Sequence, residues 1–257
     1  MKAIILAAGY ATRLRPLTET IKKELLPVGG RPIIDWIVDR VVEVAEIDEI
    51  HVVTNHRFAG DLESWARQRG GVRVHDDGTT SNEDRRGAIG DLQFTVEEAR
   101  LQGDHLLVIA GDNLFDYSLA GYVDWWHGKG TASALAVRRI PDRELIKQYG
   151  VVTIDDDERI TSIVEKPDDP QSDLAATATY IYHREHAALL QEYLEEGNSP
   201  DQPGRFPAWL VERAPIYGYA FPGLWMDIGD QAQLLEADNL LRERRGLPQR
   251  AEYSAEP

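Results

Sequence analysis

The sequence contains no cysteine, no excess of positive charge and no long apolar run, and each absence removes a class of protein. Without cysteine the chain can form neither a disulfide framework nor a thiolate metal site, which is compatible with a reducing compartment. The formal net charge of -16 argues against non-specific binding to nucleic acid, because such binding requires a basic surface. No run of about 18 apolar residues occurs, so we expect neither a transmembrane helix nor a membrane partner.

The N-terminus does not have the pattern of a secretory signal. Lys2 is followed by only six apolar residues before Gly9, and the apolar core of such a signal is longer. We therefore expect a cytoplasmic protein. Its 257 residues are enough to bury a full hydrophobic core. We expect a single α/β domain over 1–245 and a flexible polar tail over 246–257.

What the chain does contain is a buried strand followed by a basic loop. The continuous apolar run from Ala3 to Ala8 is typical of a strand buried on both faces of a parallel sheet. Gly9 ends this run, and loops that leave the carboxyl ends of such strands hold the ligands of open α/β sheets. The loop carries four cations in an acidic protein: Arg13, Arg15, Lys22 and Lys23. We interpret it as an anion-binding loop, the alternative being a solvated basic loop. It matches neither the Walker nor the dinucleotide glycine motif.

Further strands alternate with helical segments along the chain. This alternation predicts a doubly wound, mostly parallel, Rossmann-like sheet. We expect strands at 50–54, 72–75, 105–110, 131–137, 175–182 and 216–221, and helices at 34–41, 62–69, 92–100, 117–127, 186–194 and 206–212. A strand pair from 149 to 164 predicts a small antiparallel region, whose acidic stretch 155–157 reads as a solvated turn. The breaker-rich stretch 197–204 predicts a lid or a boundary.

A second polar site follows the strand at 105–110. Asp112, in the sequence Gly111-Asp112-Asn113, comes directly after that buried strand and should face the ligand crevice. Mg²⁺ prefers a few carboxylates combined with phosphate oxygens and water, so Asp112 is placed to be a magnesium ligand. The alternative is a turn aspartate that satisfies its own backbone.

Four motifs resemble, in order, those of a known enzyme family. They are Gly9-x-Ala11-Thr12-Arg13-Leu14-x-Pro16-Leu17-Thr18 with Lys23-x-Leu25-Leu26-Pro27-Val28, then Gly111-Asp112-Asn113, then Glu165-Lys166-Pro167, and finally Trp225-Met226-Asp227-Ile228-Gly229-Asp230. Together they look like the signature of sugar-1-phosphate nucleotidylyltransferases (nucleotide-sugar pyrophosphorylases), and the resemblance extends from Met1 to about Leu241. Within the last motif we expect Asp227 to be a metal ligand and Asp230 to cap the following helix.

The resemblance implies a nucleoside triphosphate and a sugar-1-phosphate as substrates, with Mg²⁺ as cofactor. It implies catalytic contacts to phosphates from Arg13, Lys23 and Lys166, and metal binding by Asp112 and Asp227. Residues 1–130 would mainly bind the nucleotide and 131–245 the sugar phosphate. The implied nucleotide-binding residues are Leu6, Ala8, Gly9, Thr12, Gly78, Thr79 and Gly111. The implied sugar-phosphate-binding residues are Asn113, Gly150, Glu165, Lys166, Thr177 and Trp225. Relatives often assemble as dimers or tetramers.

The chain departs from the family pattern in three places. The family has Pro-Lys where this chain has Lys22-Lys23, and Asn-Ala-Gly where it has Thr177-Ala178-Thr179. The polar stretch 76–90 also lacks the family's base-reading glutamine. The resemblance makes dTTP or UTP with glucose-1-phosphate the default substrates, and CTP, GTP and ATP are further possible nucleotides. Another hexose phosphate or a cyclitol phosphate would fit the altered sugar segment. A non-catalytic regulatory homologue and a glycosyltransferase are alternatives from other functional classes.

Overall fold

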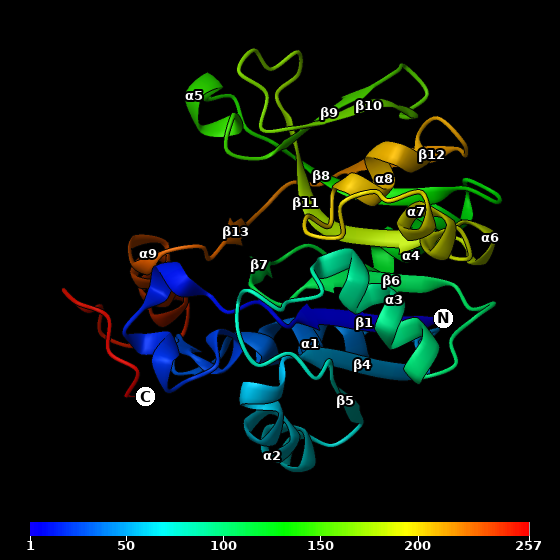
Figure 1. Cartoon of the computed structure of the whole chain (residues 1–257). Helices are drawn as coiled ribbons and strands as arrows, with labels where there is room; N and C mark the ends of the chain where they lie inside the picture. The colour runs from blue at the N-terminus through cyan, green and yellow to red at the C-terminus, as the bar shows by residue number, and fades with distance from the viewer. Residues whose placement is uncertain (257) are drawn as a thin grey trace.

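A mixed nine-stranded sheet organises the computed structural model, which describes residues 1–256 (Figure 1). Its parallel core has the order β5-β4-β1-β6 and is formed by β1 (Lys2–Ala7), β4 (Glu49–Thr54), β5 (Val72–Asp76) and β6 (Leu106–Ala110). The central strand β1 pairs in parallel with both β4 and β6, which explains its uninterrupted apolar sequence. The expected parallel, doubly wound core is confirmed.

The second half of the sheet is largely antiparallel. Strand β11 (Leu174–Tyr182) runs antiparallel to β6 and pairs with β8 and β9. The remaining strands are β8 (Ser133–Arg139), β9 (Gly150–Ile154), β10 (Ile160–Glu165) and β12 (Ile216–Ala220). β9 and β10 form the predicted antiparallel pair, and Asp155 at its turn accepts hydrogen bonds from two backbone N–H groups. A sheet that turns antiparallel beyond β6 is therefore mixed rather than uniformly parallel.

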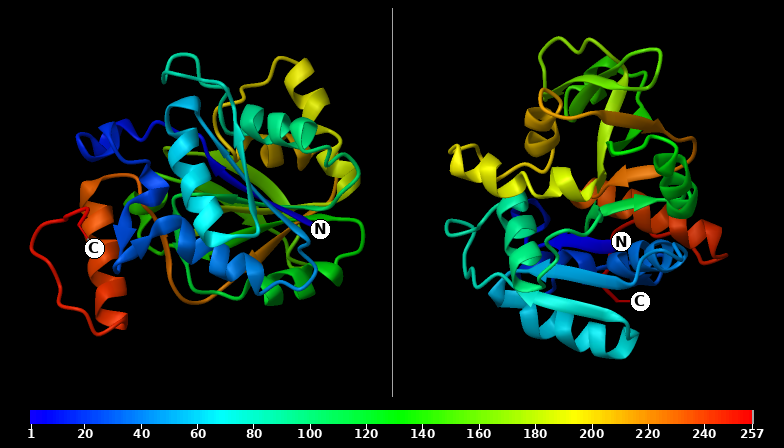
Figure 2. Two further views of the ribbon diagram at one scale, coloured as in Figure 1. Left: turned by 90° about the horizontal axis from the view of Figure 1, so that it is seen from below. Right: turned by 90° about the vertical axis from the view of Figure 1, so that its right-hand side faces the viewer.

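Helices cover both faces of the parallel core. Ala3, Ile5 and Ala7 pack with α1 (Ile33–Val42), whereas Ile4 packs with α3 (Ala88–Glu98), as the alternation of side chains along a strand requires. Figure 2 shows the two helices on opposite sides of β1. The other helices are α2 (Ala59–Arg69), α4 (Leu119–His127), α5 (Arg143–Ile146), α6 (Arg184–Ala187), α7 (Leu190–Glu195), α8 (Arg205–Leu210) and α9 (Gln231–Arg244). No helix in the described chain has the length and apolar character needed to span a bilayer.

Short elements bring the polar loops together at one end of the sheet. The basic loop folds into three 3-10 turns, Thr12–Leu14, Leu17–Glu19 and Lys23–Leu25, and leads into the pair β2 (Pro27–Val28) and β3 (Arg31–Pro32). A second small pair joins β7 (Asn113–Phe115) to β13 (Trp225–Asp227). Asp230 caps α9 through a reciprocal capping box with Gln233, as its sequence position predicts.

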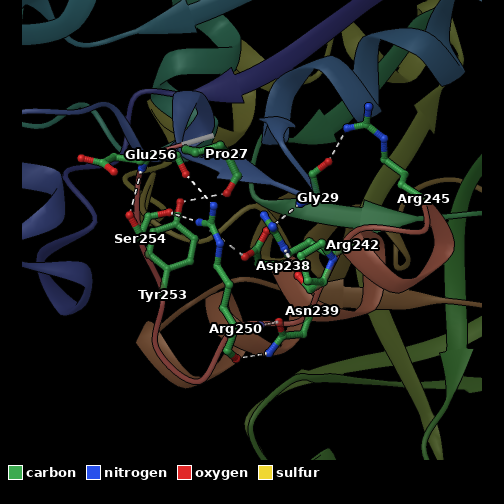
Figure 3. A network of polar contacts seen from close by, with 11 residues as sticks. Pro27, Gly29, Asp238, Asn239, Arg242, Arg245, Arg250, Tyr253, Ser254 and Glu256 are labelled. Carbon is green, nitrogen blue, oxygen red and sulfur yellow. Dashed lines mark hydrogen bonds and ion pairs between the residues drawn. The ribbon is translucent and has the colours of Figure 1, made fainter.

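The segment 246–256, which the sequence predicts to be a flexible polar tail, contacts the body of the protein in this structure. Tyr253 donates a hydrogen bond to the carbonyl of Pro27 at 2.9 Å, and the backbone N–H of Arg250 donates to the side chain of Asn239 at 2.7 Å (Figure 3). These contacts satisfy polar groups of β2 and α9. The composition of the segment does not indicate that it makes them. The last residue of the predicted tail, Pro257, lies outside the described residues.

Candidate active site

A cavity of about 510 Å³ opens beyond the carboxyl ends of β1 and β6 and extends to the antiparallel half of the sheet. This volume lies within the range of roughly 300–1,000 Å³ that is usual for small-molecule sites. Most of the residues predicted from the sequence line it. They are Leu6, Ala8, Gly9, Thr12, Arg13, Lys23, Asp112, Asn113, Gly150, Glu165, Lys166, Trp225 and Asp227. Segments separated by more than 200 residues thus meet in one site.

Gly78, Thr79 and Gly111 support the cavity without lining it. The buried hydroxyl of Thr79 is hydrogen-bonded to Asp77 at 2.7 Å and to the lining residue Tyr10 at 3.0 Å. Gly111 donates its N–H to the carbonyl of Leu6, and a Cβ at this position would lie only 2.9 Å from that oxygen. Glycine therefore lets the end of β6 approach β1 closely enough to bring Asp112 to the cavity.

Thr177 does not line the cavity, contrary to the sequence-based expectation of a sugar-facing arm. Its side chain is fully buried and donates a hydrogen bond to the carbonyl of Ala136 at 2.8 Å. The neighbours Ala176 and Ala178 line the cavity instead, because successive strand residues point to opposite faces. The register of β11 shifts between Ala176 and Tyr180, so this segment is a bulge beside the site.

The basic loop is held by a buried lysine. Lys22 is 1% exposed and donates a hydrogen bond from Nζ to the carbonyl of Gly9 at 2.6 Å. Burial lowers the pKa of Lys22, although the nearby charge of Glu24 opposes this effect. The family has proline at this position, and here the lysine ties the two ends of the loop together. Arg13, by contrast, is exposed and forms no hydrogen bond or ion pair within residues 1–256.

Lys23 and Asn113 fix the orientation of Asp112. Lys23 Nζ lies 2.7 Å from Asp112 Oδ2, and Asn113 donates to Asp112 Oδ1 at 2.7 Å. Burial pushes the pKa of Asp112 up, but the Lys23 ammonium outweighs it and holds that pKa below its usual value. Trp225 in turn donates from Nε1 to Asn113 at 2.6 Å. Asp112 is therefore an oriented, ionised carboxylate.

Asp227 lies beside Asp112 because β13 pairs with β7. Asp227 is opposite Asn113 in this pair, and the N–H of Ile228 donates to the carbonyl of Asp112 at 3.1 Å. Burial, reinforced by the charge of Asp112, raises the pKa of Asp227 to about 6, while Lys23, Arg13 and Lys166 oppose the rise. No group of three or more potential metal ligands occurs among residues 1–256. Two adjacent carboxylates fit Mg²⁺, which completes its coordination with phosphate oxygens and water.

The far end of the cavity carries Lys166, Glu165 and an aromatic pair. Lys166 has a φ of 48°, donates its backbone N–H to the carbonyl of Tyr149, and leaves its ammonium without a partner in the described structure. A Cβ at Gly150 would lie 3.1 Å from Glu165 Oε2, so glycine makes room for that carboxylate. Tyr149 packs edge-on against Trp225 at 5.1 Å between ring centroids. Sequence reasoning did not single out Tyr149, although it directly precedes Gly150.

A further wall of the cavity is formed by two loops that sequence reasoning could not bring together. Ala88 and Ile89, at the start of α3, donate backbone hydrogen bonds to Asp201 and Pro200. Arg85 also lies 3.2 Å from a carboxylate oxygen of Asp201. Other lining residues missed from the sequence are Tyr10, Ala11, Glu24, Asn82, Asp91, Gln148, Tyr180, Gln202, Pro203 and Gly204. The stretch 197–204 therefore contributes a wall of the cavity.

Comparisons with known proteins agree with this geometry. A family model described as nucleotidyl transferase matches residues 2–244. The UTP–glucose-1-phosphate uridylyltransferase of Synechocystis is 32% identical over 240 residues, covering 89% of this chain and 60% of that protein. The glucose-1-phosphate adenylyltransferase of Geobacillus stearothermophilus is 29% identical, covering 95% of this chain and 67% of that protein. The chain thus spans about 60% of the length of the first curated relatives.

A solved structure has a similar fold over almost the whole chain. It is that of a Bacillus anthracis protein provisionally assigned as a glucose-1-phosphate thymidylyltransferase, in complex with sucrose. The TM-score is 0.79 at 27% identity, and the match covers 95% of this chain and 96% of that one. The likeness includes both the parallel core and the antiparallel half of the sheet.

Proposed function

The chain belongs to the nucleotidyl transferase family, and on this premise we propose that it transfers a nucleotidyl group from a nucleoside triphosphate to a sugar-1-phosphate. One observation carries the proposal. A single cavity holds two cations without partners in the described chain, Arg13 and Lys166, together with the adjacent carboxylates Asp112 and Asp227. Such a site can align two phosphate-bearing substrates and offset their mutual repulsion.

The reaction requires no nucleophilic side chain. An oxygen of the sugar phosphate, already anionic at neutral pH, attacks the α-phosphorus of the triphosphate. A new P–O bond forms there, and the bond to the bridging oxygen of the β-phosphate breaks, so that pyrophosphate leaves with the electron pair. The chain binds the two substrates in line and stabilises the charge that develops.

The charged residues have different proposed roles, according to their positions in the cavity. Arg13, on the basic loop, binds the triphosphate and the departing pyrophosphate. Lys166, at the far end of the cavity, holds the sugar phosphate. Lys23 contacts the phosphates from beside Asp112 and keeps that carboxylate ionised. Asp112 and Asp227 would hold Mg²⁺, which when bound offsets negative charge on the phosphate oxygens.

The substrates are proposed at two levels of detail. The resemblance favours dTTP or UTP with glucose-1-phosphate, and the names of similar proteins vary in the nucleotide. A different hexose phosphate or a cyclitol phosphate is the alternative acceptor. A non-catalytic regulatory role is the alternative function, and the five charged residues retained in the cavity weigh against it. Assembly as a dimer or tetramer and a cytoplasmic location remain part of this proposal.

The test is pyrophosphate release with Mg²⁺ across five nucleoside triphosphates, each combined with a panel of sugar-1-phosphates and a cyclitol phosphate. We expect one strong pair whose turnover requires both substrates and stops when the metal is chelated. A reaction without acceptor would indicate hydrolysis instead. Folded protein that neither releases pyrophosphate nor binds any nucleotide would contradict the proposal.

A further inference from the structure

The loop that follows β1 has a run of backbone N–H groups without acceptors. Residues 9–13 all line the cavity. The N–H groups of Gly9, Tyr10, Ala11 and Thr12 donate to no acceptor in the described chain. Successive N–H groups in such a turn can bind an anion, and Ala11 has the left-handed conformation, with φ and ψ both at 45°, that these turns contain. The loop can therefore receive phosphate oxygens through its backbone.

The carbonyl groups of the same loop are held by other parts of the protein. Lys22 donates from Nζ to the carbonyl of Gly9 at 2.6 Å, and the hydroxyl of Thr18 donates to the carbonyl of Ala11 at 2.9 Å. A carbonyl and the N–H that follows it belong to one planar peptide group and, in the trans form, point in opposite directions. By holding the carbonyl of Gly9, Lys22 thus also fixes the direction of the N–H of Tyr10.

Lys22 itself does not reach the cavity. Its side chain is 1% exposed, is absent from the cavity lining, and lies 3.6 Å from Glu24 Oε2 and 5.6 Å from the ring centre of Phe58. Burial lowers the pKa of Lys22 in spite of the charge of Glu24. A buried ammonium group costs stability, and an apolar side chain of similar length would avoid this cost. The hydrogen bond to Gly9 gives the lysine a function that an apolar side chain lacks.

We infer that Lys22 is a positioning residue for the phosphates of the nucleoside triphosphate, because it holds the Gly9 carbonyl and so orients the N–H groups of the loop toward the phosphate oxygens. Lys22 acts through the backbone and touches neither substrate. It differs in this from its neighbour Lys23, which lines the cavity and contacts Asp112. The inference rests on the proposed function and adds a residue to it.

The first experiment compares Lys22→Met with the parent by calorimetric titration. Methionine has a similar length and no donor. We expect the affinities for the parent's best nucleoside triphosphate and for inorganic tripolyphosphate to fall roughly tenfold or more, the usual scale for a hydrogen bond to a charged group. The affinity for the corresponding nucleoside and the KM for the sugar phosphate should stay unchanged. A purely structural lysine would lower the unfolding temperature and leave all these affinities of the folded protein as in the parent.

Lys2→Met is the matched control, because it removes another mostly buried lysine. Lys2 is 9% exposed and pairs with Asp48 and Glu49 at the start of β1, whereas the cavity opens beyond the end of that strand. It should bind the triphosphate and tripolyphosphate like the parent. Equal losses in Lys2→Met and Lys22→Met would indicate a general effect of net charge and would overturn the inference.

Hydrogen exchange separates positioning from a local effect of charge. In the parent, the N–H groups of Leu14 and Arg15 donate to the carbonyls of Ala11 and Thr12. Without the bond to Gly9 the loop should loosen, so these two amides should exchange faster in ligand-free Lys22→Met while β1 keeps the parent's rates. Weakened triphosphate binding with unchanged exchange in the loop would mean that Lys22 acts by its charge alone, and would overturn the positioning role.

Thr18→Val keeps the inference testable if Lys22→Met does not fold. Thr18 lies outside the cavity and holds the loop at Ala11, so its loss should also weaken tripolyphosphate binding and leave the sugar phosphate KM unchanged. Unchanged tripolyphosphate affinity in folded Lys22→Met, or in Thr18→Val where the first variant is unfolded, overturns the inference and leaves nucleotidyl transfer intact. Absence of pyrophosphate release by the parent with every substrate pair contradicts the proposed function itself.

Discussion

The two ends of the cavity differ in which groups are without partners. At the phosphate end, the cations Arg13 and Lys166 have no partner in the described chain, and the carboxylates Asp112 and Asp227 lie side by side. At the end formed by the start of α3, the cation Arg85 is paired with Asp201, and the buried acids Asp77 and Asp91 lie close together. One end therefore suits phosphate and metal, whereas the cation Arg85 at the other end is already paired.

The residues at the phosphate end come from several elements. Asp112 follows the buried strand β6, Asp227 ends β13, Lys166 follows β10, and Arg13 lies in the first 3-10 turn of the basic loop. The end formed by the start of α3 depends instead on two irregular stretches, 76–90 and 197–204, that contact each other through backbone hydrogen bonds. On the proposed function, a change at the phosphate end should therefore affect the reaction with every nucleotide.

Asp112→Asn should have the largest effect, because it removes an oriented carboxylate from the proposed metal site. We expect metal-dependent turnover to fall roughly 10³-fold or more with every nucleotide, since a bound metal contributes several kcal/mol to such reactions. Initial-rate assays across a Mg²⁺ titration would measure this. Asp124→Asn, on the exposed side of α4, is the control and should behave as the parent. Normal metal-dependent turnover by Asp112→Asn would show that Asp112 is not a metal ligand.

Arg13→Ala and Lys166→Ala should each lower kcat/KM by roughly 10²–10³, the usual consequence of losing one preorganised donor to a transition state. The two variants should differ in the substrate whose binding weakens, the nucleotide for Arg13 and the sugar phosphate for Lys166. Separate titrations of the two substrates distinguish these results. Arg15→Ala is a matched control, since Arg15 lies on the same loop outside the cavity. Equal losses in Arg15→Ala and Arg13→Ala would indicate a general charge effect.

Gly9→Ala should have a smaller effect that is confined to nucleotide use. A Cβ at Gly9 would meet no protein atom within 4 Å, so the variant should fold like the parent. If the triphosphate occupies that space, the added methyl group should lower kcat/KM for the nucleotide roughly 10–200-fold. Thermal unfolding and nucleotide titration together provide the measurement. Gly60→Ala, whose Cβ is equally free of contacts, is the control, and unchanged nucleotide use by Gly9→Ala would place the triphosphate elsewhere.

The sequence was sufficient to predict the parallel core, the antiparallel strand pair and most of the phosphate end. Those features follow from local patterns: an apolar run for β1, a carboxylate directly after β6, and a capping aspartate before α9. The pairing of the buried acids Asp77 and Asp91 could not be predicted, because they become neighbours only when α3 packs back on β1 and β4. The docked tail likewise depends on contacts between residues more than 200 positions apart, such as Tyr253 with Pro27.

Thr177→Val should have the smallest effect, and it tests a position where local reasoning and the fold disagree. Thr177 faces away from the cavity and donates to the carbonyl of Ala136, so the variant should lose about 1 kcal/mol of stability and keep its KM for the sugar phosphate. Urea unfolding and acceptor titration measure the two quantities. Ala176→Val adds its methyl groups on the cavity side and should instead raise the KM for the acceptor. A raised acceptor KM in Thr177→Val alone would mean that the bulge turns this side chain toward the sugar when substrate binds.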